Sequence, residues 1–258
     1  MKKQVVRLAL LHMMPKIGNS SYNRQQLRRA LAVAAGHEAQ IALTPEMIEY
    51  GQLFDCYRER EKVPVYPSRY LCDLGEVAYK YNMYFIVGIL EREEPTGNLY
   101  NAVACINSQG HLEGTYRKMY TTQKEENLSI LSGNELATFT WTENQLGLMV
   151  GEDVYLAKLP ILLREMGAQL ILGVVSPGVE GMAKEWCLRS AETRLPFIVC
   201  GGNLQGSKKN ISYGESLVIR LGQVQYAFKS LEPTVFILDI ELNTNNIELV
   251  VTTSLAMK

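Results

Sequence analysis

The stretch LGLMVGEDVYLAKLPILLREMG, residues 146–167, decides the fold of this chain. It opens with an apolar run, turns through Gly151, Glu152 and Asp153, and continues with apolar residues at helical spacing. A strand that passes through a tight corner into a helix is where many α/β enzymes hold a nucleophile. In this chain the first residue of the corner is a glycine.

Segments with strand and helix character alternate on both sides of this corner. The expected strands span residues 5–11, 40–43, 84–90, 100–106, 169–174, 196–200, 213–220, 223–228 and, as the last, 234–240. Besides the helix after the corner, helices are expected over residues 20–36, 70–81 and 179–194. The irregular residues 51–67 are expected to form a loop or short helical turn over the mouth of a pocket. The pattern predicts a four-layer α-β-β-α sandwich formed by one domain, residues 1–258.

The composition argues against several classes of partner. The 258 residues are 47% hydrophobic and carry 26 basic and 27 acidic side chains, a formal net charge of -1. Binding to nucleic acid or to an anionic membrane requires a basic surface, which this balance does not provide. No apolar run approaches the ~18 residues of a membrane helix. We therefore expect a small-molecule ligand, and neither nucleic acid nor a membrane as a partner.

Cysteine and histidine usage argues against a disulfide framework and a metal site. The five cysteines are an odd number without CxxC spacing. The three histidines, His12, His37 and His111, belong to different expected elements and have no metal-ligand spacing. We expect no metal and no cofactor, and a reducing cytoplasm as the location.

Several short motifs follow one another in a characteristic order. They are Pro45-Glu46, the hairpin from Asn101 to Lys118 that ends in Tyr-Arg-Lys, Gly151-Glu152-Asp153, Arg189-Ser190-Ala191-Glu192 and Tyr213-Gly214-Glu215-Ser216. Each motif is weak alone, but in this order and spacing the chain resembles the nitrilase, or carbon-nitrogen hydrolase, superfamily over nearly its whole length. The resemblance implies the same α-β-β-α sandwich, and a homodimer or higher homo-oligomer.

The resemblance also implies a set of site residues. In the superfamily a cysteine thiolate attacks an amide or nitrile carbon, a glutamate takes the thiol proton, and a lysine stabilises the developing negative charge. Glu46 matches the glutamate and Lys118 matches the lysine. The supporting second glutamate corresponds to Glu125 or Glu126, between which the sequence does not choose. Tyr50 and Glu152 are expected to contact the substrate.

Gly151 stands where the superfamily has its cysteine. Loss of a nucleophile from a cooperating set lowers the rate by roughly a million-fold, so covalent turnover should be negligible. Cys187 and Cys200 are interpreted as core thiols, because buried structural cysteines are far commoner than displaced nucleophiles. A carboxylate attack by Glu152 is a minor alternative, and a water activated by Glu46 is a stronger one.

Two hypotheses from different classes follow. In the first, the chain is a nitrilase-like pseudoenzyme that binds a small amide, nitrile or carboxylate compound. In the second, it is an active amidase-type hydrolase that works without a cysteine. A single glutamate or lysine is usually a surface residue, so the case for Glu46 and Lys118 rests on the whole-chain match.

The dimer interface is expected to form from two parts of the chain. One is an apolar face of the helix after the corner, with Leu156, Leu159, Leu163 and Met166, and the other is the tail, residues 247–255.

Overall fold

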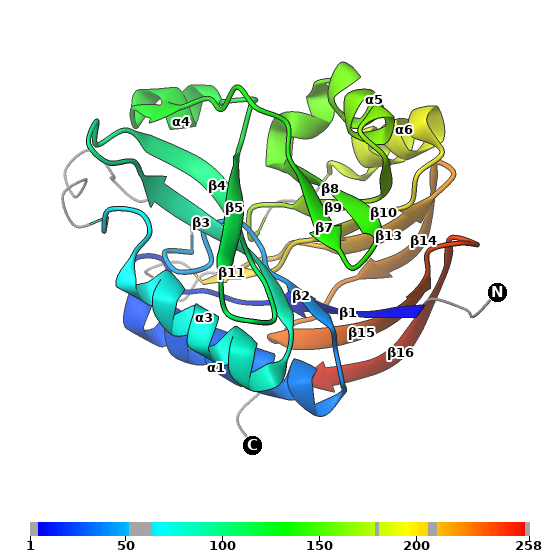
Figure 1. The fold of residues 1–258 in the computed structure, drawn as a ribbon, viewed down its shortest axis with the longest axis horizontal. Coiled ribbons are helices and arrows are strands. Elements are labelled where there is room, and N and C mark those ends of the chain that lie inside the picture. The colour runs from blue at the N-terminus through cyan, green and yellow to red at the C-terminus, as the bar shows by residue number, and fades with distance from the viewer. Residues whose placement is uncertain (1–4, 52–62, 179–180, 206–210, 256–258) are drawn as a thin grey trace.

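The computed structural model describes residues 5–51, 63–178, 181–205 and 211–255. Two β-sheets pack face to face, and helices cover their outer faces (Figure 1). The expectation of a four-layer α-β-β-α sandwich is confirmed.

The first sheet has the strand order β16-β15-β1-β2-β3-β4-β5, and the short β6 pairs with β4. Parallel pairing joins β1 to β2 and β2 to β3, whereas the neighbours on either side of this trio are antiparallel. Its strands are β1 (Val5–His12), β2 (Ile41–Leu43), β3 (Tyr84–Arg92), β4 (Leu99–Ile106), β5 (Leu112–Arg117), β6 (Ile130–Leu131), β15 (Thr234–Glu241) and β16 (Asn246–Ser254).

The second sheet has the order β14-β13-β10-β9-β8-β7. Its strands are β7 (Thr138–Trp141), β8 (Asn144–Val150), β9 (Ala168–Val174), β10 (Phe197–Cys200), β13 (Ser216–Arg220) and β14 (Gln223–Phe228). A separate pair, β11 (Leu204–Gln205) and β12 (Ile211–Ser212), lies outside both sheets. The ends of parallel strands β8, β9 and β10 place several loops at one edge, which is where α/β proteins build sites.

Helices α1 (Ser20–Gly36) and α3 (Arg69–Tyr81) cover the first sheet, while α5 (Lys158–Glu165) and α6 (Ala183–Thr193) cover the second (Figure 1). The side chain of Asn19 caps α1 by accepting a hydrogen bond from the backbone N–H of Tyr22 at 3.1 Å. Leu27 and Leu31, spaced at four residues, are buried against the first sheet, as the periodicity predicts. The short α4 (Gln123–Asn127) lies beside the site described below.

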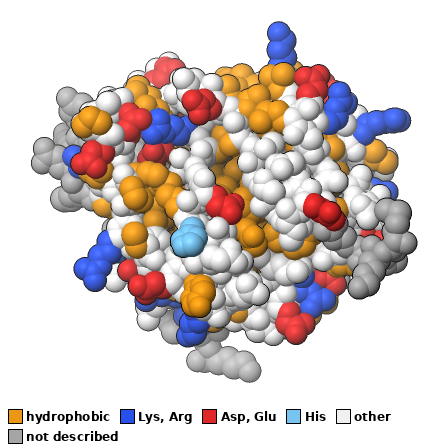
Figure 2. Space-filling view, in the orientation of Figure 1, with side chains coloured by type: hydrophobic (Ala, Val, Ile, Leu, Met, Phe, Trp, Pro, Cys, Tyr) orange, Lys and Arg blue, Asp and Glu red, His pale blue; other side chains and the backbone are white. Residues whose placement is uncertain are grey.

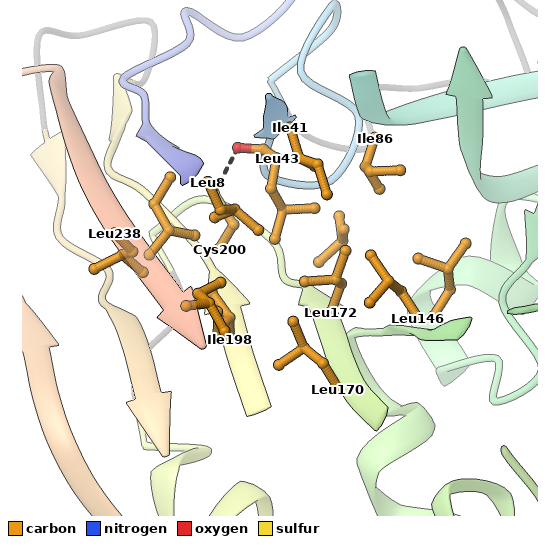
Figure 3. Close-up of a cluster of buried hydrophobic side chains, with 14 of the residues drawn as sticks. Leu8, Ile41, Leu43, Ile86, Leu146, Leu170, Leu172, Ile198, Cys200 and Leu238 are labelled. Carbon is orange, nitrogen blue, oxygen red and sulfur yellow. Dashed lines mark hydrogen bonds between the residues drawn. The ribbon is translucent and has the colours of Figure 1, made fainter. Parts of the chain in front are cut away.

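The main core lies between the two sheets (Figure 3). Leu8 and Leu43 from the first sheet meet Leu172 and Ile198 from the second, and all are fully buried. Because side chains alternate along a strand, the residues between them face outward and pack under the helices. This packing fixes the two sheets relative to each other, and with them the strand ends that carry the site.

Charged side chains of both signs are interspersed on the face shown in Figure 2. Within the described ranges, no helix is both long enough and apolar enough to cross a membrane.

The structure corrects several sequence expectations. Strand 234–240 is not the last, because β16 follows it and pairs with it along its whole length. Helix α6 begins at Ala183 rather than at 179, and residues 179–180 lie outside the described residues, as does most of the expected loop 51–67. After the corner the chain forms a 3₁₀ turn, η2 (Gly151–Tyr155), before α5 begins.

Two of the four residues predicted on the apolar face of the dimer interface, Leu159 and Leu163, are buried within the chain itself. Leu159 and Leu163 are 3% and 0% exposed, because α5 packs them onto the second sheet within the protein's own core. Met166 is 45% exposed and Leu162 is 41% exposed. Helical periodicity identifies an apolar face, but it does not say whether that face meets the same chain or another one.

Candidate active site

Glu46 reaches the site from the loop after β2. Its backbone N–H donates to the carbonyl of Val175, beyond β9, at 3.1 Å, which ties the loop to the second sheet. Thr44 Oγ1 accepts a hydrogen bond from the N–H of Gly88 at 2.9 Å. An ideal Cβ at Gly88 would lie only 2.7 Å from Cα of Glu46, so the loop can cross β3 this closely because residue 88 has no side chain.

Lys118 follows β5, and a buried aspartate fixes its position against the corner. Asp153 accepts hydrogen bonds from the Tyr116 hydroxyl at 2.6 Å and from the backbone N–H groups of Met119 and Tyr120 at 2.9 and 2.8 Å. The same carboxylate accepts from the N–H of Val150 at 3.0 Å. Burial raises the pKa of Asp153, although the Tyr116 hydroxyl opposes this by stabilising its charge. Through these hydrogen bonds, Asp153 links the segment around Lys118, residues 116–120, to the turn that begins at Gly151.

Glu125, and not Glu126, faces the lysine. Lys118 Nζ donates to both carboxylate oxygens of Glu125 at 2.9 Å, and both side chains are 3% exposed. Glu125 is held by a capping box, in which its carboxylate accepts from the N–H of Thr122 at 2.8 Å and its own N–H donates to Thr122 Oγ1 at 3.2 Å. Glu126 is exposed and contacts Thr121 and Gln123 on the surface of the same short helix.

Asn101 links the two glutamates. Its Nδ2 donates to Glu46 Oε2 at 3.0 Å and to Glu125 Oε1 at 2.9 Å, while its Oδ1 is buried and has no hydrogen-bond partner among the described residues. The carbonyl of Asn101 accepts from the backbone N–H of Lys118 at 2.8 Å. A third carboxylate, Glu152, also receives a hydrogen bond from Lys118 Nζ. Five side chains therefore form one continuous network.

Gly151 lies where Glu46 and Lys118 converge. Its φ of +47° is in the left-handed region, which glycine adopts without steric penalty. An ideal Cβ built on Gly151 would overlap Glu46 Oε1 and lie 3.5 Å from Lys118 Nζ. The glutamate and the lysine therefore meet at residue 151, as the sequence predicts, and the Glu46 carboxylate fills the space of a side chain.

Burial and charge shift the pKa values of this network in opposite directions. Burial raises the pKa of Glu46 to about 8, against the opposing effect of the Lys118 ammonium. Burial also acts to lower the pKa of Lys118, but Glu46, Glu125 and Glu152 outweigh it and raise that pKa. The pKa of Glu125 is lowered, because Lys118 and Asn101 overcome the effect of burial. At neutral pH the lysine is charged, and Glu46 is close to its titration point.

Within the described part of the chain, no thiol is among the three atoms nearest to a side chain built at Gly151. Cys200 is 0% exposed in the core between the sheets and donates to the carbonyl of Leu43 at 3.2 Å (Figure 3). Burial raises its pKa. Cys187 is half-buried on α6 beside the turn between β13 and β14. Cys56 lies outside the described residues.

The other predicted features lie as follows. Tyr50 is buried in an apolar cluster with Met47 and Leu90, so its predicted contact with a ligand stays a prediction. Arg189 pairs with Glu192 on α6, three residues further along the same helix. Among the described residues, no group of three or more His, Cys, Asp and Glu side chains is arranged to hold a metal ion.

Sequence reasoning missed two side chains that shape the candidate site: Asn101, a member of the network, and Asp153, which holds the segment after Lys118. Asn101 is a lone amide in the otherwise apolar strand β4, and a polar residue at a buried strand position is itself a signal. Asp153 was assigned only to a polar corner, although its burial is complete. Thr122 and Glu125, three residues apart, carry the capping-box signature that distinguishes Glu125 from Glu126.

Comparison with known proteins agrees with this geometry. A family model described as carbon-nitrogen hydrolase matches residues 7–244. The chain belongs to this family. It is similar to an omega-amidase of Bos taurus, with 27% identity over 92% of this chain and 88% of the relative, and to a probable nitrilase of Schizosaccharomyces pombe, with 24% identity over 82% and 79%.

Solved structures of family members share the fold. An amidase of Nesterenkonia sp. AN1 superposes with a TM-score of 0.81 at 19% identity, over 94% of this chain and 93% of that chain. That structure shows covalent addition of the acetamide moiety of fluoroacetamide at the active-site cysteine. The carbon-nitrogen hydrolase fold is thus established for this chain.

Proposed function

We propose that this carbon-nitrogen hydrolase family member is a pseudoenzyme, which binds a small amide, nitrile or carboxylate compound at the Glu46–Lys118 site without covalent turnover. One observation carries the proposal: the glutamate and the lysine converge on Gly151, and the atoms that a side chain there would meet first belong to those two residues, not to a thiol. The similar amidase forms its covalent adduct on a cysteine. A glycine offers no atom for that bond.

The remaining parts of the site support binding. Lys118 is a buried cation and Asn101 a buried amide, and both are held by hydrogen bonds from separate strand ends. Groups held in place in this way bind a carbonyl or amide with little loss of conformational freedom. A protein that has lost the nucleophile keeps this contribution, which comes from hydrogen bonding and charge alone.

The test is incubation of the purified chain with a panel of amides, nitriles and N-carbamoyl compounds, followed by mass spectrometry. We expect binding without product in excess of the protein concentration. A family member that retains its cysteine serves as the positive control for the panel. Product beyond stoichiometry that disappears in Glu46→Gln would overturn the proposal.

A second candidate, an amidase-type hydrolase that uses water, is favoured by the pKa of Glu46. A carboxyl group that titrates near pH 8 can act as a general base at slightly alkaline pH. This route predicts slow multiple turnover that increases as pH rises through about 8 and is lost in Glu46→Gln. Absence of product at every pH tested favours the pseudoenzyme.

We further propose that the chain forms a single domain, associates as a homodimer and works in the cytoplasm. Exposed apolar residues are available for a subunit contact on the surface of α5, where Leu162 and Met166 lie, and on β16, where Leu249 and Val250 are 37% and 44% exposed. Light scattering at micromolar concentration tests the association. A molar mass equal to that of one chain would contradict it.

A further inference from the structure

The hydrogen-bonding capacity of Lys118 is fully used within the protein. An ammonium group has three N–H donors and no acceptor. Lys118 Nζ donates to Glu125 Oε1 and Oε2, both at 2.9 Å, and to Glu152 Oε2. Three acceptor atoms therefore match three donors. A ligand oxygen can bind the ammonium only after one of these carboxylate oxygens leaves.

The two carboxylates differ in how firmly they are held. The Glu125 side chain is 3% exposed and also accepts hydrogen bonds from Thr122 and Asn101. The Glu152 side chain is 29% exposed and reaches the ammonium from the first turn after Gly151. Moving Glu125 would break several hydrogen bonds and leave a charge buried, whereas Glu152 can turn toward water. Glu152 is the carboxylate that a ligand would displace.

The network also contains more acceptors than donors. Among the described residues, three glutamates surround the single ammonium of Lys118. The Oδ1 atom of Asn101, a residue 1% exposed, accepts no hydrogen bond from the part of the chain that the structure describes, although it lies inside the network. A ligand that brings N–H donors would satisfy this oxygen, since buried acceptors are normally paired. A ligand carboxylate would instead add negative charge and find every lysine donor occupied.

We propose that Glu152 is a specificity-determining residue, an internal carboxylate that occupies the third donor of Lys118 and makes the site select neutral or cationic N–H donors over carboxylates. This inference rests on the proposed function, because it assumes a ligand at the Glu46–Lys118 site. It narrows the ligand class to amides and amines. It also assigns a role to the residue that directly follows Gly151.

The test uses two probes of nearly identical shape, propionamide and propionate. Each is titrated into the full ¹⁵N-labelled chain at pH 7, and the amide resonance of Gly151 reports binding at the site. The variants are Glu152→Gln, which removes the charge, and Glu152→Ala, which also frees the lysine donor. Glu126→Gln is the matched control, because it removes the same charge from an exposed neighbour of Glu125.

We expect the wild type to prefer propionamide over propionate by about tenfold or more, because the propionate carboxylate would lie beside the like charge of Glu152 without a free lysine donor to pair with. The preference should fall by about tenfold in Glu152→Gln and fall further or reverse in Glu152→Ala. Glu126→Gln should match the wild type. Because Glu152→Gln preserves the shape of the side chain, it keeps the test valid if the alanine variant fails to fold.

Two outcomes would overturn the inference, and they are distinguishable. Equal binding of both probes to the wild type, or an unchanged preference in both Glu152 variants, would remove the role of Glu152 and leave the binding site in place. Absence of any shift at Gly151 with either probe, in the wild type and in every variant, would remove the proposed function and this inference with it.

Discussion

Lys118 is expected to stabilise the fold, because its ammonium group pairs with the buried carboxylate of Glu125. Glu46, Glu125 and Lys118 are 6%, 2% and 2% exposed, and the lysine bonds both oxygens of Glu125. Removing one partner of a buried ion pair leaves its charge uncompensated and typically costs about 3–5 kcal/mol. We therefore expect Lys118→Met, which keeps most of the side-chain volume, to lower the free energy of unfolding by about that amount at pH 7.

The measurement is urea-induced unfolding followed by circular dichroism. The double variant Lys118→Met/Glu125→Gln should recover part of the loss, because the second change removes the unpaired charge. Without the ammonium, the pKa of each buried carboxyl rises in the folded state, so the folded chain binds more protons than the unfolded chain. The stability of Lys118→Met relative to the wild type should consequently improve as the pH falls from 7 to 5.

The control is Lys124→Met, which removes a lysine from the exposed surface of α4 and should change the stability by no more than about 0.5 kcal/mol. A loss below about 1 kcal/mol in Lys118→Met would refute the reasoning, because surface ion pairs are worth no more than that. It would mean that water reaches the network and screens its charges.

Three further predictions follow from the site. Burial holds the pKa of Glu46 at about 8 instead of 4.5, so the unfolded chain loses this proton at lower pH than the folded chain, and the free energy of unfolding should fall as the pH rises from 5 to 8. In urea titrations, Glu46→Gln should reduce this fall by up to about 1.4 kcal/mol per pH unit. Parallel pH dependences for the wild type and the variant would contradict the assignment. Gly151→Cys should place a thiol beside the lysine ammonium once the Glu46 carboxylate has moved aside. The pH dependence of its alkylation should then give a lower thiol pKa than that of Gly18→Cys, a variant at an exposed glycine that also has positive φ. Equal pKa values would argue against a preserved nucleophile position. Gly88→Ala should clash with the backbone of Glu46 and destabilise the fold by about 1–3 kcal/mol. Gly114→Ala should have little effect, because the space around Gly114 is open. Similar unfolding curves for the two variants would show that the loop after β2 moves to accommodate the added methyl group.

Most elements of the sandwich were predictable because their signals are local. The apolar run that ends at Val150 and the helical spacing of Leu27 and Leu31 each depend on a few neighbouring residues. Strand β16 was missed because it lies at the edge of its sheet, where alternate residues are exposed and the apolar pattern is weak. The buried position of Leu159 and Leu163 was missed because helical spacing alone does not identify the surface that covers a face.

The sequence by itself predicted the candidate site, through its resemblance to the carbon-nitrogen hydrolase family: Glu46 after one strand, Lys118 after another, and a glycine at the corner. Their order along the chain is enough to place them at strand ends, because strands and turns follow local patterns. Only the tertiary structure decided that Asn101 joins the two glutamates and that Glu152 takes the last ammonium donor. The contacts of Asn101 with Glu46 and of Glu152 with Lys118 join segments far apart in the sequence, and they depend on how the two sheets pack and where each side chain points, which no local pattern records.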